Sequence, residues 1–120
     1  MRVLIIDDEK HIADTLVMIL QQSGWEATAA YDGKLALQHV DTFHPKVVIS
    51  DVILPGMNGI EVCMAIQSKY PACHIFLFSG QPATDELVSD ARQRGFHWEL
   101  LAKPIEPQEL LDKLEPFATE

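Results

Sequence analysis

The 120-residue sequence has only two cysteines, Cys63 and Cys73, and they lack the CxxC spacing of zinc or redox sites. Both lie in apolar surroundings, so we expect buried, reduced thiols without chemistry of their own. No apolar run approaches 18 residues, and the apolar stretch VLII near the N-terminus ends in acids. These absences argue against a transmembrane helix and a signal peptide, and they predict a cytoplasmic protein.

Basic residues are also scarce, with 9 Lys and Arg against 18 Asp and Glu and a formal net charge of −9. A nucleic-acid duplex must be met by clustered Lys and Arg, so we expect no direct nucleic-acid binding. The five histidines do not have the spacing of metal ligands, which disfavours a zinc site.

The length and a hydrophobic fraction of 48% suit a single domain, which we assign to residues 1–120. Short apolar runs alternate with amphipathic stretches, which is typical of strand and helix units around a parallel sheet. The predicted strands are Val3 to Asp7, Glu26 to Ala30, Lys46 to Asp51, His74 to Ser79 and Glu99 to Ala102. The first, third and fourth are nearly continuous apolar runs, as in strands covered on both faces, whereas the second is weaker and suits an edge.

Five helices are predicted between and after these strands from apolar residues that recur at helical spacing. The first and the fourth end at glycines, and the last begins at a proline. The residues that mark the helices are Ile12, Leu16 and Leu20 before Gly24, then Leu37 with Val40, then Val62, Cys63 and Ile66, then Leu87 and Ala91 before Gly95, and finally Leu110, Leu111, Leu114 and Phe117 after Pro107.

Chemically active side chains stand at the predicted strand ends. The ends of parallel strands open onto one edge of a doubly wound sheet, where ligands bind. Short loops would therefore bring the side chains into one crevice. They are Asp7 and Asp8 after the first strand, Asp51 after the third, Ser79 after the fourth, and Lys103 with Pro104 after the fifth.

Three crowded carboxylates need a cation, because like charges ~4 Å apart repel by about 4 kcal/mol at an effective dielectric of about 20. Oxygen ligands with room for water and phosphate suit Mg²⁺, or Mn²⁺ as a substitute. Lys103 supplies a fixed positive charge that would pair first with a carboxylate and then with a phosphoryl oxygen. The simpler interpretation, in which Asp8 or Glu9 only caps the first helix, becomes weaker because Asp51, Ser79 and Lys103 fall at matching strand ends.

Four segments, IIDDE, SDVILPGMNGIEV, FLFSG and LLAKP, resemble the signature segments of the response-regulator receiver domains of two-component signalling, in the same order and spacing. The resemblance covers the whole chain. It implies a (βα)5 doubly wound parallel sheet with the flavodoxin-like strand order 2-1-3-4-5 and helices on both faces.

The resemblance also implies roles for individual residues. Asp51 would be the phosphoacceptor, and Asp8, Asp51 and the backbone carbonyl of Ile53 would bind Mg²⁺, supported by Asp7. Ser79 and Lys103 would contact the phosphoryl group, and the Lys103-Pro104 bond is often cis in the family. A domain of this kind catalyses its own phosphorylation and slow hydrolysis without being a classical enzyme.

The implied partners are a histidine kinase or phosphotransfer protein docking near the first helix, and an effector reached through the last two helices and the last strand. Dimerisation on phosphorylation is a further hypothesis. The sequence leaves open whether the domain stands alone or belongs to a longer regulator or hybrid kinase.

One position departs from the family pattern. The family usually has Tyr or Phe three residues before the lysine, where this chain has Leu100. Trp98 would share a strand face with Leu100, so it is a candidate switch residue beside Ser79, although burial of Trp98 as packing is the commoner outcome.

Three other functions compete with a phosphorylated module. A degenerate receiver that only binds proteins is disfavoured by the full set of acids and by Lys103. An aspartyl-phosphate phosphatase usually needs a second acid where this chain has Ile53. A flavodoxin is disfavoured because DDEKH would repel the flavin phosphate.

Overall fold

The computed structural model describes residues 1–78 and 84–118, and its main feature is a five-stranded parallel sheet. The strands are β1 (Arg2–Ile6), β2 (Glu26–Ala30), β3 (Val47–Asp51), β6 (His74–Phe78) and β7 (Glu99–Leu101). They are arranged as β2-β1-β3-β6-β7, and all neighbours run parallel. Counted along the chain this is the order 2-1-3-4-5, so the predicted flavodoxin-like (βα)5 sheet is confirmed.

Strand burial follows the sequence patterns. The apolar residues of β1, β3 and β6 are almost completely buried, and β2 lies at an edge as predicted. Predicted and observed boundaries differ by at most one residue at each end. The exception is the predicted end of the fourth strand at Ser79, which lies outside the described residues.

The five predicted helices are present. They are α1 (Lys10–Gln22), α2 (Gly33–Phe43), α3 (Gly59–Lys69), α4 (Thr84–Gln93) and α5 (Pro107–Leu114). Gly24 follows α1 with a φ of 96°, a conformation that side chains with a Cβ rarely adopt. Phe117 belongs to a separate 3-10 turn, η1 (Glu115–Phe117), which contains Pro116, and its ring packs on His74 with the centroids 4.4 Å apart.

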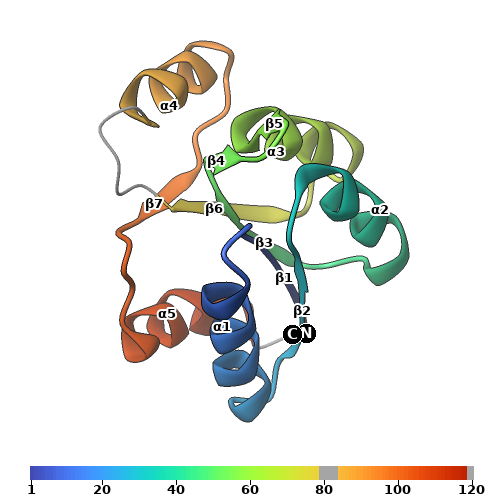
Figure 1. The fold of residues 1–120 in the computed structure, drawn as a ribbon, viewed down its shortest axis with the longest axis vertical. Coiled ribbons are helices and arrows are strands. Elements are labelled where there is room, and N and C mark those ends of the chain that lie inside the picture. Colours follow the sequence, from blue (N-terminus) through green and yellow to red (C-terminus); the bar gives the residue numbers. More distant parts are fainter. Residues whose placement is uncertain (79–83, 119–120) are drawn as a thin grey trace.

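Helices cover both faces of the sheet, with α1 and α5 on one face and α2, α3 and α4 on the other (Figure 1). Each face has its own apolar core, formed by side chains that alternate in direction along the strands. The core on the α1 and α5 side includes Leu16, Leu20, Leu110 and Leu114. None of the described helices is long and apolar enough to cross a membrane.

The segment after Asp51 contains a short hairpin that sequence patterns did not indicate. Its strands are β4 (Ile53–Leu54) and β5 (Met57–Asn58), which pair antiparallel. Gly56 turns the hairpin with a φ of 71°. The hairpin leads directly into α3, which links the start of that helix to the end of β3.

Candidate functional site

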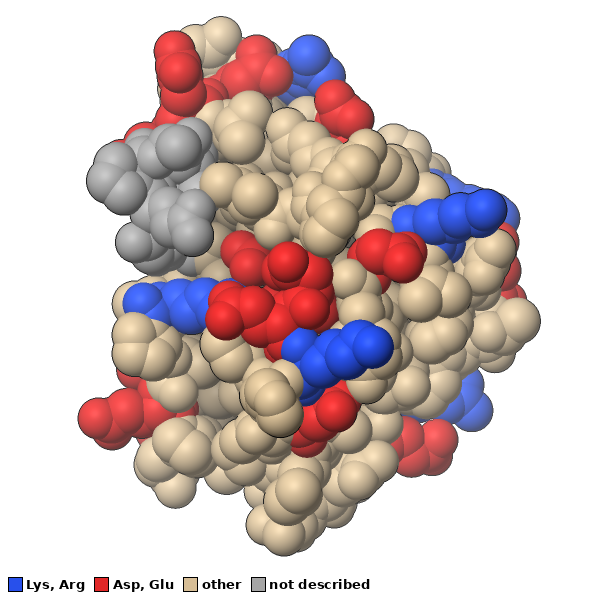
Figure 2. Space-filling model, in the orientation of Figure 1, with Lys and Arg blue, Asp and Glu red and all other residues tan. Residues whose placement is uncertain are grey.

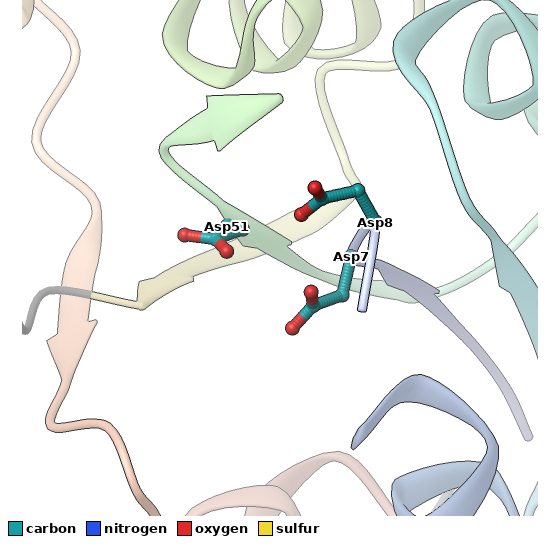
Figure 3. A group of neighbouring side chains, drawn as sticks. All are labelled: Asp7, Asp8 and Asp51. Carbon is teal, nitrogen blue, oxygen red and sulfur yellow. The ribbon is translucent and has the colours of Figure 1, made fainter. Parts of the chain in front are cut away.

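Three carboxylates meet at the carboxyl ends of the central strands. Asp51 ends β3, and Asp7 and Asp8 follow β1, which is the neighbour of β3 in the sheet. One carboxylate oxygen from each residue lies within 4.8 Å of the others, and the three side chains are neighbours at the ends of these strands (Figure 3). Acidic side chains gather in the middle of this face of the molecule, over the ends of β1 and β3 (Figure 2).

Lys103 enters this group from the segment after β7. Its Nζ donates to Asp7 Oδ2 at 2.8 Å and to Asp51 Oδ2 at 3.0 Å, and it lies 3.4 Å from Glu9 Oε1. Its side chain is 19% exposed. The peptide bond to Pro104 is cis, the conformation expected from the resemblance. One ammonium is therefore shared by three carboxylates.

Burial dominates the electrostatics of Asp7, whose side chain is completely inaccessible. Burial raises the pKa of this carboxyl, and hydrogen bonds from Lys103 and from the Glu9 backbone N–H oppose the increase. Burial alone would lower the pKa of Lys103, but its bonds to Asp7 and Asp51 outweigh that effect and raise the pKa above the ordinary value. Lys103 is accordingly a permanent cation in the site.

The start of α3 fixes the backbone around Asp51. The Gly59 N–H donates to the Val52 carbonyl at 2.7 Å, and Asn58 caps the helix by accepting from the Ile60 N–H at 2.7 Å. A Cβ on Gly59 would lie 2.0 Å from the Asp51 carbonyl oxygen, so only glycine allows this approach. The helix start therefore sets the position from which the Asp51 side chain projects.

The donor set suits Mg²⁺. Asp7, Asp8 and Asp51 offer hard oxygen ligands, and Asp8 is exposed, which leaves access for water and a phosphoryl group. Opposite ligands of octahedral Mg²⁺ lie about 4.2 Å apart, so oxygens within 4.8 Å need only small side-chain rotations to share an ion. The three acids that come together are the predicted metal residues Asp7, Asp8 and Asp51. Their binding of a metal stays a prediction, as does that of the Ile53 carbonyl.

A sequence model of the response regulator receiver domain matches residues 3–115. The chain belongs to the response regulator receiver family. The function of a receiver domain in two-component signalling is thereby supported, in agreement with the resemblance found in the sequence.

Solved structures of receiver domains are closely similar to this one. The chemotaxis response regulator CheY4 of Vibrio cholerae is 29% identical with a TM-score of 0.82, and the match covers 96% of each chain. A two-component transcriptional regulator, AraC, from Clostridium phytofermentans is 32% identical with a TM-score of 0.79, covering 97% of this chain and 90% of that one. The BeF3-activated DrrB receiver domain is 28% identical with a TM-score of 0.82, covering 99% and 97%.

Of the predicted switch residues, Leu100 and Trp98 are not brought together with the acids. Ser79 lies outside the described residues. Leu100 is half-buried in β7 against the core on the α2, α3 and α4 side. Trp98 lies just before the amino end of β7, whereas Lys103 follows its carboxyl end. The Trp98 Nε1 donates to Gln67 Oε1 of α3 at 3.0 Å. This position suits packing of Trp98, and its switch role stays a prediction.

Two residues of the site escaped the sequence patterns. The sequence patterns indicate Glu9 only as a helix cap, and Gly59 only as part of the segment SDVILPGMNGIEV. The carboxyl group of Glu9 beside two aspartates was a visible signal, but its pairing with Lys103 depends on a contact between segments 94 residues apart. The close approach of Gly59 to Asp51 leaves no sequence signal beyond the glycine itself.

Proposed function

We propose that Asp51 of this receiver domain accepts a phosphoryl group from a histidine kinase in a Mg²⁺-dependent reaction, and that the phosphorylated form signals through a conformational change. The observation that carries the proposal is the sharing of the Lys103 ammonium between Asp7 and Asp51, beside a third carboxylate. This arrangement combines a nucleophile, a metal-binding set of oxygens and a fixed cation.

In the proposed reaction, an Asp51 carboxylate oxygen attacks the phosphorus of a phosphohistidine. The new O–P bond forms as the P–N bond breaks, and the histidine leaves with the electron pair and takes a proton. Lys103 moves its hydrogen bond from the Asp51 carboxylate to a phosphoryl oxygen, where charge accumulates. Mg²⁺ held by Asp7, Asp8 and Asp51 would neutralise further negative charge on the phosphoryl group.

Hydrolysis resets the proposed switch when water attacks phosphorus and returns the Asp51 carboxylate and inorganic phosphate. Phosphorylation adds charge and acceptor oxygens next to the start of α3 and to the end of β6, where Phe78 pairs with Asp51. We propose that Ser79 donates to the new oxygens and that the change reaches α4, β7 and α5, where an effector or a second receiver domain would bind.

A groove beside the acids supports docking of the kinase or a phosphotransfer protein at α1. It encloses about 430 Å³ between α1 and the segment after Lys103, and it is lined by Ile12, Leu16, Ile19, Phe78, Pro104 and Ile105. An apolar groove next to the nucleophile suits a partner helix that presents its phosphohistidine to Asp51. A cytoplasmic location is part of this proposal and agrees with two free, buried cysteines.

The test is phosphorylation by a small donor. The protein is incubated with Mg²⁺ and acetyl phosphate, and its intact mass is compared with that of Asp51→Asn and of Asp32→Asn. Asp32 caps α2 through its side chain and is a matched control outside the acid group. We expect one added phosphoryl group in the wild type and in Asp32→Asn, and none in Asp51→Asn. Absence of phosphorylation and of Mg²⁺ binding in the wild type would favour the phosphorylation-independent binding module instead.

A further inference from the structure

Among the described residues, three carboxylates lie around the Lys103 ammonium, and Glu9 is the one that has no part in the proposed metal-binding set. Its Oε1 lies 3.4 Å from the Lys103 Nζ, farther than the Asp7 and Asp51 oxygens at 2.8 and 3.0 Å. The contact spans the gap between the N-cap of α1 and the segment after β7. Glu9 thus holds the same ammonium that the acid group needs.

The Glu9 side chain does not bind the free backbone N–H groups at the start of its own helix. Glu9 stands at the N-cap position of α1, where Ser, Thr, Asp or Asn side chains commonly accept from a free backbone N–H, and its own side chain makes no such bond. Its backbone N–H donates to Asp7 Oδ1 at 2.9 Å, which fixes the main chain. The side chain is directed to Lys103 instead of to its own helix.

The Glu9 and Asp7 side chains differ in how far they can move to keep contact with the Lys103 ammonium. The Asp7 side chain is 0% exposed and closed in by the fold, whereas the Glu9 side chain is 60% exposed and has three rotatable bonds. When Asp7 turns to a bound cation, Lys103 gives up part of its contact with that carboxylate. Glu9 is then the nearby acceptor that can move closer without disturbing the core.

We propose that Glu9 is a positioning residue that holds the Lys103 ammonium while Asp7 and Asp51 bind Mg²⁺. The inference rests on the proposed Mg²⁺-dependent function and adds a regulator of its metal affinity. Without Glu9, a cation that is only 19% exposed would face the metal with one fewer anionic partner. Lys103 would then compete more strongly with Mg²⁺ for Asp7 and Asp51.

The first measurement is the Mg²⁺ dissociation constant of Glu9→Gln by isothermal titration calorimetry. We expect Mg²⁺ to bind about two- to five-fold more weakly than to the wild type, which is the range of an exposed ion pair. The matched control is Glu26→Gln, which removes the same charge and an ion pair with Arg2 of the same 3.4 Å length at the other end of the strands. Glu26→Gln should leave the dissociation constant unchanged.

A double-mutant cycle separates positioning from simple charge. If Glu9 acts through Lys103, Glu9→Gln has no further effect on Mg²⁺ binding in a Lys103→Met background. If Glu9 acts only as a distant charge on the metal, the same weakening persists in that background. Thermal unfolding verifies that each variant is folded, and Lys103→Gln, which retains a donor for Asp7, closes the cycle if Lys103→Met is not folded.

Two outcomes overturn the inference: an unchanged dissociation constant in Glu9→Gln, or an equal weakening with and without Lys103. Measurements on the wild type distinguish a wrong inference about Glu9 from a wrong proposed function. If the wild type binds Mg²⁺ but is not phosphorylated on Asp51, the function fails and the cycle still decides the role of Glu9. If it binds no Mg²⁺, the metal dependence and the role of Glu9 are both wrong.

Discussion

Lys103 Nζ lies 2.8 Å from Asp7 Oδ2, although 96 positions separate the two residues in the chain. The contact joins the end of the first strand to the segment after the last one. It also supplies the partner that a completely buried carboxylate requires. The same pair therefore contributes to stability and brings the cation to Asp51.

Replacing Lys103 tests both roles. We expect Lys103→Met to lower the free energy of unfolding by about 1–3 kcal/mol, because the buried Asp7 loses its cation and is left to be protonated or unpaired. Lys113→Met is the matched control, since it breaks an exposed ion pair with Glu99 at 2.7 Å. Lys113→Met should lower the free energy of unfolding by about 0–1 kcal/mol. Urea unfolding measures both, and equal effects would contradict a structural role for the Lys103 and Asp7 pair.

Asp8 lies in the group of acids without the burial of Asp7. We expect Asp8→Asn to stabilise the metal-free protein by about 0.5–1 kcal/mol, because it removes repulsion among carboxylates in a partly exposed setting. Thermal unfolding with and without Mg²⁺ gives the second readout. A metal that binds only the folded state raises the Tm of the wild type, and this increase should be lost in Asp8→Asn. A Tm increase of the same size in both proteins would place the Mg²⁺ site elsewhere.

Gly59 tests how closely α3 must approach β3. Gly59→Ala would place a Cβ against the Asp51 and Val52 carbonyl oxygens, which belong to the backbone and cannot rotate away. We expect a loss of about 2 kcal/mol or more in unfolding free energy and slower phosphorylation of Asp51. Ser68→Ala, at an exposed position of the same helix, should change neither quantity. An unfolding free energy of Gly59→Ala equal to that of the wild type would contradict this expectation, because the start of α3 could then move away from β3 without a loss of stability.

His74 should make the protein less stable in mild acid. Burial lowers the pKa of this imidazole, with a smaller opposing effect of Glu99, and its ring packs between Phe76 and Phe117. The folded state therefore favours the neutral form, while the unfolded chain takes up a proton near the ordinary pKa of about 6.5. The resulting stability is present above that pH and is lost as the pH falls toward the lowered folded value.

The measurement is the free energy of unfolding in urea from about pH 8 to about pH 5. His74→Phe should show a shallower loss below about pH 6.5 than the wild type, because it keeps the aromatic packing and removes the titrating group. His97→Gln, which removes an imidazole at an exposed position, is the matched control. Equal slopes in the wild type and in His74→Phe would contradict the assignment to His74.

The sequence predicted the features that depend on local pattern and topology. Continuous apolar runs identified β1, β3 and β6, and the parallel order then brought Asp7, Asp8, Asp51 and Lys103 to one edge. β7 begins at Glu99 as predicted, so Trp98 lies just before the strand, and its contact with Gln67 of α3 depends on tertiary packing that the local pattern does not encode. Two-residue strands such as β4 and β5 leave no periodicity to detect.

The contacts of Glu9 could not be predicted for a different reason. Local rules assign an acid at the start of a helix to capping, and the contact with Lys103 arises only when strand ends far apart in the chain are brought together. The close approach of Gly59 to Asp51 likewise follows from the packing of α3 and not from any local preference.

The central claim, that Asp51 is the phosphoacceptor, is tested most directly by locating the phosphoryl group. The protein is treated with acetyl phosphate and Mg²⁺, reduced with borohydride, which converts an aspartyl phosphate to homoserine, and mapped by peptide mass spectrometry. We predict homoserine at position 51 alone, and none when Mg²⁺ is chelated. Homoserine at another aspartate, or at none while the protein binds Mg²⁺, would contradict the account.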